Sequence, residues 1–210
     1  MSGNNGFRGN NGFREMLKLG VILALYAAAA CVGLAFVYAG TAKVIAQRQK
    51  ADLEAAINDL FPAADDFKPI ADISSPDPTV TINTDRVFVA LKNGETIGMA
   101  LETSRAGYGG TIRILVGVGT DERISGVKIL EHSETPGLGA NAGSSTYYVD
   151  RANGIHFYDQ FTGKMVSDSF VPKQDVIAIT AATVTSRAVS ESVKAAGEAA
   201  SIWFAKGGTR

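Results

Sequence analysis

The stretch from residue 19 to residue 42 contains no charged side chain, and this run of 24 positions constrains the 210-residue chain more than any other feature. A helix that crosses the hydrocarbon of a bilayer needs about 20 apolar residues. Lys18 and Lys43 flank the run, and Tyr38 lies where an aromatic side chain would anchor at the interface. We therefore expect one transmembrane helix over residues 19–42.

Two other interpretations of the apolar run stay open. A cleaved signal peptide usually has a hydrophobic region of only about 7–15 residues. A lipoprotein signal would use Cys31 at the end of an AAAC segment, although the apolar run continues for eleven residues past it. Basic residues flank the run three against three, so charge alone does not orient the span. The short leading segment is the easier side to leave in the cytoplasm.

The rest of the chain divides into three parts. Residues 1–18 contain a direct repeat of GNNGFR, and because Gly and Asn have little to bury, we expect a disordered cytoplasmic tail. Residues 43–62 keep apolar side chains at helical spacing and predict a juxtamembrane helix that Pro62 ends. A connecting segment rich in Asp, Ser and Pro, residues 65–78, opens a domain that occupies residues 63–210.

Short runs rich in Val, Ile, Thr and Phe predict β-strands in this domain. Asn93 and Gly94 indicate a tight hairpin, because both residues tolerate a positive φ. No helix-length segment separates the runs, which favours an antiparallel sheet over alternating strands and helices. A further strand-like run covers residues 176–179, and a helix with one apolar face is expected from Thr185. The predicted strands are 79–84, 86–92, 95–101, 111–118 and 123–130.

The composition excludes several kinds of site. Twenty Lys and Arg against 21 Asp and Glu leave no basic footprint, so we expect no nucleic-acid partner. One Cys and two His cannot build a zinc, iron–sulfur or His-rich metal centre, so we expect no metal.

Small residues and four hydroxyls gather in residues 180–186 (TAATVTS), where the C-terminal helix is expected to begin. The free N–H groups and the dipole of a helix N-terminus favour an anion, above all a phosphate. An ordinary Ser or Thr N-cap would explain the same pattern without a ligand.

Residues 180–186 resemble the flavinylation motif of the FMN-binding subunits of Rnf and Na⁺-translocating NADH:quinone reductase complexes, Ser/Thr-Gly-Ala-Thr followed by x-Thr-Ser. Residues 131–139 (EHSETPGLG) are similar to the family's Glu-Thr-Pro-Gly-Leu-Gly segment. Smaller matches cover residues 107–110 and 157–164. These segments follow the family's order, and the chain length favours the G subunit of Rnf. The family's Gly is Ala181 here, which is strained only if its φ is positive.

The resemblance implies an α+β fold, an antiparallel-sheet FMN-binding domain with flanking helices that is tethered by one N-terminal transmembrane helix. It implies that a flavin transferase attaches FMN covalently, through a phosphoester, to Thr183, which is then an attachment point and not a catalytic residue. Thr185 and the amides of residues 184–186 would hold the phosphate, and Leu138 would pack on the flavin ring. The expected contacts beyond Thr183 are Thr180, Ala182, Val184, Thr185, Glu134, Thr135, Gly137 and Leu138.

The implied function is electron relay in an ion-translocating ferredoxin:NAD⁺ oxidoreductase, beside other membrane subunits and on the periplasmic side of the inner membrane. Three alternatives stay open: the C subunit of the quinone reductase, a membrane-anchored flavin-binding or sensory module, and a lipoprotein adaptor held through Cys31. Two His and four aromatic residues are expected to be structural rather than to stack on the flavin: His132, His156, Tyr147, Tyr148, Phe157 and Tyr158.

Overall fold

The computed structural model describes residues 9–208, in two compact units that divide after Ala51. Helix α1 (Gly9–Leu60) supplies the described part of the first unit and extends into the second. Residues 1–8 of the expected tail lie outside the described residues, whereas residues 9–18 are helical. Helix formation is cooperative, so the turns that precede a long apolar helix extend it at little cost.

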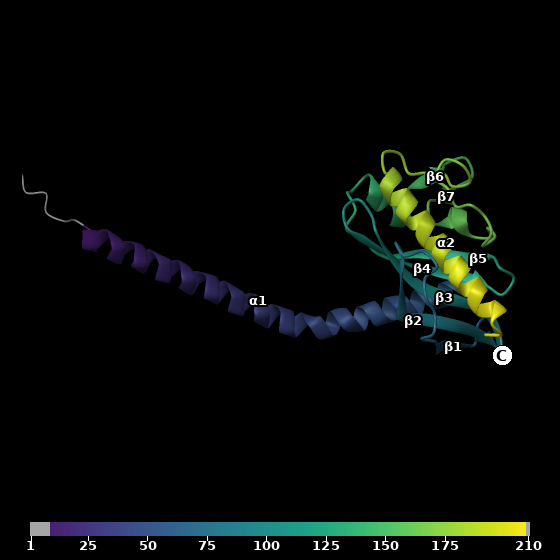
Figure 1. Cartoon of the computed structure of the whole chain (residues 1–210), viewed down its shortest axis with the longest axis horizontal. Helices are drawn as coiled ribbons and strands as arrows, with labels where there is room; N and C mark the ends of the chain where they lie inside the picture. Colours follow the sequence, from purple (N-terminus) through teal and green to yellow (C-terminus); the bar gives the residue numbers. More distant parts are fainter. Residues whose placement is uncertain (1–8, 209–210) are drawn as a thin grey trace, which may run out of the picture. The chain divides into compact units, whose positions relative to one another are not determined.

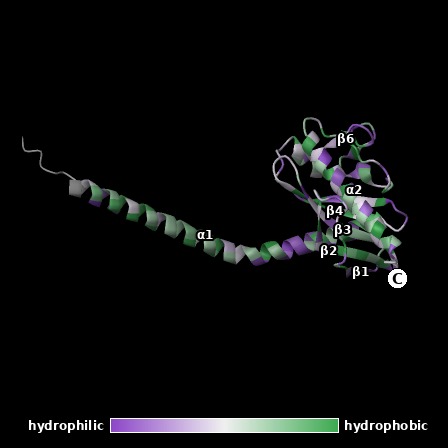
Figure 2. Ribbon diagram, viewed as in Figure 1, coloured by the Kyte–Doolittle hydropathy of each residue, from purple (hydrophilic) through white to green (hydrophobic). Residues whose placement is uncertain are grey.

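Within the first unit, α1 is long and apolar enough to cross a membrane by length and composition. Its large apolar side chains are exposed, among them Leu34 at 70% and Phe36 at 76%, and Figure 2 shows the hydrophobic colour along this helix. Thr41 donates its hydroxyl to the carbonyl of Val37 at 2.8 Å, so this polar group is satisfied inside the helix. These properties fit a helix whose surroundings are lipid.

The second unit is built on a five-stranded antiparallel sheet in the order β1-β2-β3-β4-β5. The sheet confirms the predicted fold class, and Asn93 (φ 53°) with Gly94 (φ 83°) forms the expected hairpin between β2 and β3. The strands are β1 (Asp66–Pro69), β2 (Thr81–Lys92), β3 (Glu95–Ala106), β4 (Thr111–Gly119) and β5 (Ile124–Glu131).

Several predicted strand boundaries were wrong. The two strands expected over residues 79–92 are one strand, β2, whose register shifts between Ile82 and Val87. Strand β1 lies in the expected connecting segment, where it forms a short edge strand that ends at Pro69. The run expected as a strand at 176–179 has only an isolated bridge between Pro172 and Val176.

A second, two-stranded sheet was not predicted. It pairs β6 (Tyr148–Asp150) with β7 (Ile155–His156), and two short 3₁₀ helices, η1 (Gly139–Gly143) and η2 (Asp159–Phe161), flank it along the chain. Strands of two or three residues are too short to show a period in the sequence.

The two faces of the large sheet are covered by different helices. Helix α2 (Thr183–Ala205) lies across one face (Figure 1), and its Val189 and Val193 are fully buried in the main core. The last turns of α1 cover the other face, where Leu53 and Ile57 pack in a second apolar cluster with residues of β2, β3 and β4. Because α2 is fixed along its whole apolar side, its first turn is held in a defined place beside the loops that follow β3 and β5.

Candidate functional site

Helix α2 begins at Thr183, two residues before the expected start, and its first turn has no side-chain cap. The N-cap residue is Ala182, so the interpretation of this segment as an ordinary Ser or Thr N-cap was wrong. Ser186 instead fixes the segment that precedes the helix. Its hydroxyl accepts from the amide of Ile179 and donates to the carbonyl of Ala182, both at 2.9 Å.

The uncapped turn leaves backbone donors available for an anion. The amides of Thr183, Val184 and Thr185 have no acceptor among the described residues, as expected for the first turn of a helix. The amide of Ser186 differs from the expectation, because it donates to the carbonyl of Ala182 at 3.0 Å. The first turn therefore leaves three amides free, those of residues 183–185, and not the expected set that included Ser186.

Ala181 adopts a left-handed conformation, with φ at +60°. This region costs a non-glycine residue roughly 1–2 kcal/mol, because Cβ approaches the following carbonyl oxygen. The chain therefore carries a side chain where the related motif has Gly and where the backbone favours Gly.

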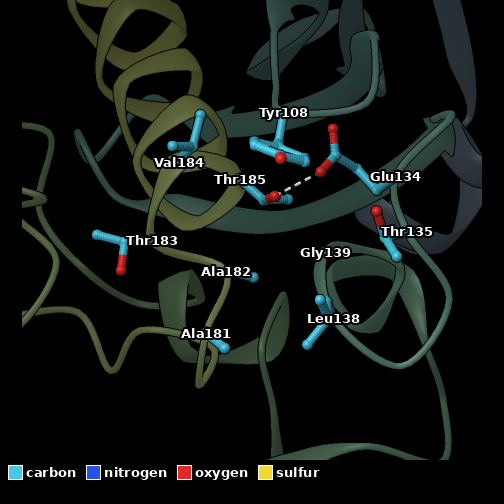
Figure 3. A pocket seen from close by; sticks show the side chains of 10 residues that line it. All are labelled: Tyr108, Glu134, Thr135, Leu138, Gly139, Ala181, Ala182, Thr183, Val184 and Thr185. Carbon is cyan, nitrogen blue, oxygen red and sulfur yellow. Dashed lines mark hydrogen bonds between the residues drawn. The ribbon is translucent and has the colours of Figure 1, made fainter.

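The two hydroxyls of the first turn have different environments. Thr185 is 1% exposed and donates to Oε2 of Glu134 at 2.5 Å, so it does not have the free phosphate-binding role expected for it. Thr183 is exposed, and no partner of its hydroxyl occurs in the described part of the chain. Figure 3 shows Thr183 on the side of the turn that faces away from Glu134. Of these two threonines, only Thr183 offers a free hydroxyl.

Glu134 is a buried carboxylate without a cation. It is 6% exposed, its Oε1 accepts from the amide of Gly109 at 3.0 Å, and residues 9–208 give it no ion-pair partner. A Cβ atom on Gly107 or Gly139 would collide with its carboxylate oxygens, so both positions need glycine for a close approach. The amide of Glu134 donates to Nδ1 of His132 at 3.3 Å, which gives this His a structural contact.

A cavity of about 400 Å³ opens between the first turn of α2 and the loops after β3 and β5, which is within the usual size range of ligand pockets. Tyr108, Leu138 and Val184 give it apolar walls, and Glu134 and Thr135 give it polar ones (Figure 3). The lining residues are Tyr108, Glu134, Thr135, Leu138, Gly139, Ala181, Ala182, Thr183, Val184 and Thr185.

Most of the predicted site residues meet at this cavity, and all except Thr180 and Gly137 line it. Thr180 lines a second cavity, which residues 173–181 form together with Thr183. Gly137 lines neither of the two cavities and has φ at +76°, in a turn that brings Thr135 and Leu138 to the wall. Sequence reasoning missed Tyr108 as a lining residue, although the matched segment at 107–110 contains it.

The other aromatic candidates lie elsewhere. Phe157 is fully buried in the main core. His156 stacks between Tyr148 and Tyr158, with ring centroids 4.3 Å and 5.5 Å apart, and its Nδ1 lies 3.0 Å from the carbonyl of Tyr147. Residues 9–208 contain no cluster of His, Cys, Asp and Glu that could hold a metal ion.

Comparison with known proteins identifies the family of two regions of the chain. Residues 107–198 match the FMN-binding domain, and residues 1–60 match the RnfG N-terminal region. The antiparallel sheet, the match to the FMN-binding domain and the long apolar helix together define a membrane-anchored protein with an FMN-binding domain.

Curated relatives narrow this class to one family. The G subunit of the Na⁺-translocating ferredoxin:NAD⁺ oxidoreductase complex of Acetobacterium woodii is 32% identical over 199 residues, which cover 86% of this chain and 89% of the relative. The G subunit of the ion-translocating oxidoreductase complex of Aliivibrio fischeri strain ES114 is 31% identical over 215 residues, or 91% and 90% of the two chains. The chain belongs to the G-subunit family of ion-translocating (Rnf) oxidoreductase complexes.

Proposed function

We propose that this chain relays electrons within an ion-translocating ferredoxin:NAD⁺ oxidoreductase complex, through FMN that is bound covalently to Thr183. One observation supports the attachment at Thr183. Its hydroxyl is exposed and has no partner among the described residues, and it lies at an uncapped helix N-terminus on the wall of a cavity of about 400 Å³. The names of the relatives and the FMN-binding domain support the relay role.

The attachment is a phosphoryl transfer from FAD. Oγ of Thr183 attacks the phosphorus of the FMN half, the bond from this phosphorus to the bridging oxygen breaks, and AMP leaves. The hydroxyl proton passes to a base of the flavin transferase. The exposed position of Thr183 admits such an enzyme, and the free N-terminus of α2, which begins at Thr183, favours the phosphate charge there.

The residues of the cavity suit a flavin ring. Tyr108, Leu138 and Val184 would pack on its apolar faces and exclude water, while Glu134 and Thr135 would lie near its polar atoms. FMN, when bound, supplies the electron-transfer chemistry, and the protein sets its orientation, access and electrostatics. Thr183 remains an attachment point in this function, without an acid–base role.

We also propose that α1 holds the domain at the periplasmic side of the inner membrane, beside the other membrane subunits of the complex. The intact mass of the purified chain tests the anchor, because lipoprotein processing before Cys31 would remove residues 1–30. Chemical labelling of an engineered cysteine in the domain, in intact cells, tests on which side of the inner membrane the domain lies. Labelling only after the cells are opened would contradict the periplasmic location.

A denaturing gel under ultraviolet light tests the covalent flavin. The full chain, produced in a host with the flavin transferase, should give a fluorescent band that Thr183→Ala abolishes. Ser167→Ala is the control, since Ser167 is an exposed hydroxyl outside the motif and outside both cavities, and it should keep the fluorescence. A dark wild-type band, or a fluorescent Thr183→Ala band, would refute the attachment.

A further inference from the structure

A second cavity adjoins the segment that leads into helix α2. It is formed by residues 173–181 together with Thr183. Ala181 and Thr183 are the residues that line both this cavity and the one that contains Glu134. Thr183 therefore stands between two spaces, and a group attached to its hydroxyl can occupy either one.

The two charged residues that line the second cavity differ in their partners. The carboxylate of Asp175 is engaged by the loop itself, because it accepts from the amides of Phe170 at 2.7 Å and Val171 at 2.6 Å. Lys173 is exposed, and its ammonium forms no ion pair within the described residues. Its backbone is fixed at φ +73°, where its amide donates to the carbonyl of Val176 at 2.8 Å. The backbone of Lys173 is thus held in place, while its ammonium has no ion-pair partner within the described residues.

The two cavities also differ in charge. The first contains the carboxylate of Glu134, which has no cation among the described residues and would repel a phosphate. Thr183 lies on the side of the helical turn away from Glu134 (Figure 3). In the second cavity the ammonium of Lys173 balances the carboxylate of Asp175, whereas the first cavity has the carboxylate of Glu134 and no cation in its lining. The phosphodiester formed on Thr183 carries one negative charge, so the second cavity is the electrostatically favoured place for it.

We propose that the ammonium of Lys173 binds the phosphodiester on Thr183, so that the phosphate occupies the second cavity and the flavin ring occupies the first. This inference rests on the proposed attachment of FMN to Thr183. It assigns the phosphate to a residue outside the matched motif, ten positions before Thr183 in the sequence. Arg187, one helical turn after Thr183, is the competing cation, since residues four apart on a helix are neighbours.

The test compares the melting temperature of the flavinylated full chain in detergent with that of the unmodified chain, at low and high salt. Flavinylation should raise the melting temperature of the wild type, and part of the rise should vanish at 1 M salt, where the screening length falls to about 3 Å. Lys173→Gln should remove this salt-sensitive part, a loss of about 2 °C. Lys173→Arg and Lys92→Gln should behave like the wild type, because the first keeps the charge and the second removes an exposed one from the end of β2.

The outcomes separate the two proposals. A wild-type chain without covalent flavin overturns both the attachment and this inference. A flavinylated Lys173→Gln chain with the full salt-sensitive rise overturns this inference alone. Loss of the rise in Arg187→Gln but not in Lys173→Gln also overturns it, since the phosphate would then be held on the helix side.

Discussion

The carboxylate of Glu134 and the hydroxyl of Thr185, 51 residues apart in the sequence, are joined by a buried hydrogen bond of 2.5 Å. The bond ties the loop after β5 to the first turn of α2. The two segments that resemble family motifs are therefore one structural unit, and the cavity opens between them. A change in either partner should affect the stability of the domain and the shape of the flavin site together.

Thr185→Val should lower the free energy of unfolding by about 1–3 kcal/mol, because the buried Oε2 of Glu134 loses its donor at nearly constant side-chain volume. Thr103→Val is the matched control: Thr103 is fully buried, and its hydroxyl has no partner among residues 9–208, so its replacement should cost little. Denaturant unfolding of the unmodified full chain in detergent measures both. Equal costs for the two variants would contradict a stabilising Glu134–Thr185 bond.

Tyr108 should quench the fluorescence of the attached flavin, because it is 77% exposed and forms a wall of the cavity proposed for the ring. An aromatic phenol in contact with an excited flavin donates an electron to it and suppresses emission. We expect Tyr108→Leu to brighten the native protein and to leave the denatured band unchanged. Tyr148→Leu serves as the control, since Tyr148 stacks on His156 and does not line the cavity. An unchanged native emission of Tyr108→Leu would place the ring elsewhere.

Asp175 should make the loop that carries Lys173 sensitive to acid. Partial burial by itself would raise the pKa of Asp175, but hydrogen bonds from the side chain of Ser169 and from the amides of Val171 and Phe170 outweigh it, and the net pKa is lowered. A lowered pKa in the folded state gives stability that is present above the unfolded value of about 3.9 and is lost as the pH falls through the folded value.

Asp175→Asn should therefore destabilise the chain at pH 7, and its difference from the wild type should shrink as the pH falls below about 4. Unfolding curves of both proteins between pH 7 and pH 3 measure this difference. A difference that is constant over this range would show that the charge of Asp175 has no part in holding the loop.

The sequence predicted the features that depend on local pattern. The apolar run of residues 19–42, the hairpin at Asn93-Gly94 and the antiparallel sheet all follow from the spacing or conformational freedom of neighbouring residues. Strand β1 was missed because its four residues are recognised only through pairing with β2, which no local pattern encodes. The same limit explains why two strands were predicted over residues 79–92, where the structure has the single strand β2. A register shift inside a strand is a property of its pairing, here of β2 with β3.

The candidate site also combines features that local pattern predicts with contacts that it does not predict. The motif resemblance predicted Thr183 and Glu134 as site residues, and both line one cavity. It did not show that Thr185 is buried against Glu134 or that Ser186 is hydrogen-bonded to Ala182. The role of Tyr108 as a wall also depends on how the turn between β3 and β4 folds over the cavity. Contacts between segments far apart in the sequence decide which hydroxyl is free, and local spacing carries no information about them.

Ala181→Gly should stabilise the chain by about 0.5–1 kcal/mol, because relief of the left-handed strain at φ +60° exceeds the entropy that a glycine adds to the unfolded state. Ala182→Gly is the control with the opposite sign: Ala182 has φ at −130° and is buried, so its replacement removes a packed methyl group and relieves no strain. Denaturant unfolding of the unmodified full chain in detergent measures the two variants against the wild type. If both variants were destabilised to the same degree, the strain at Ala181 would be negligible, and the side chain would be tolerated at this turn as easily as the glycine of the related motif.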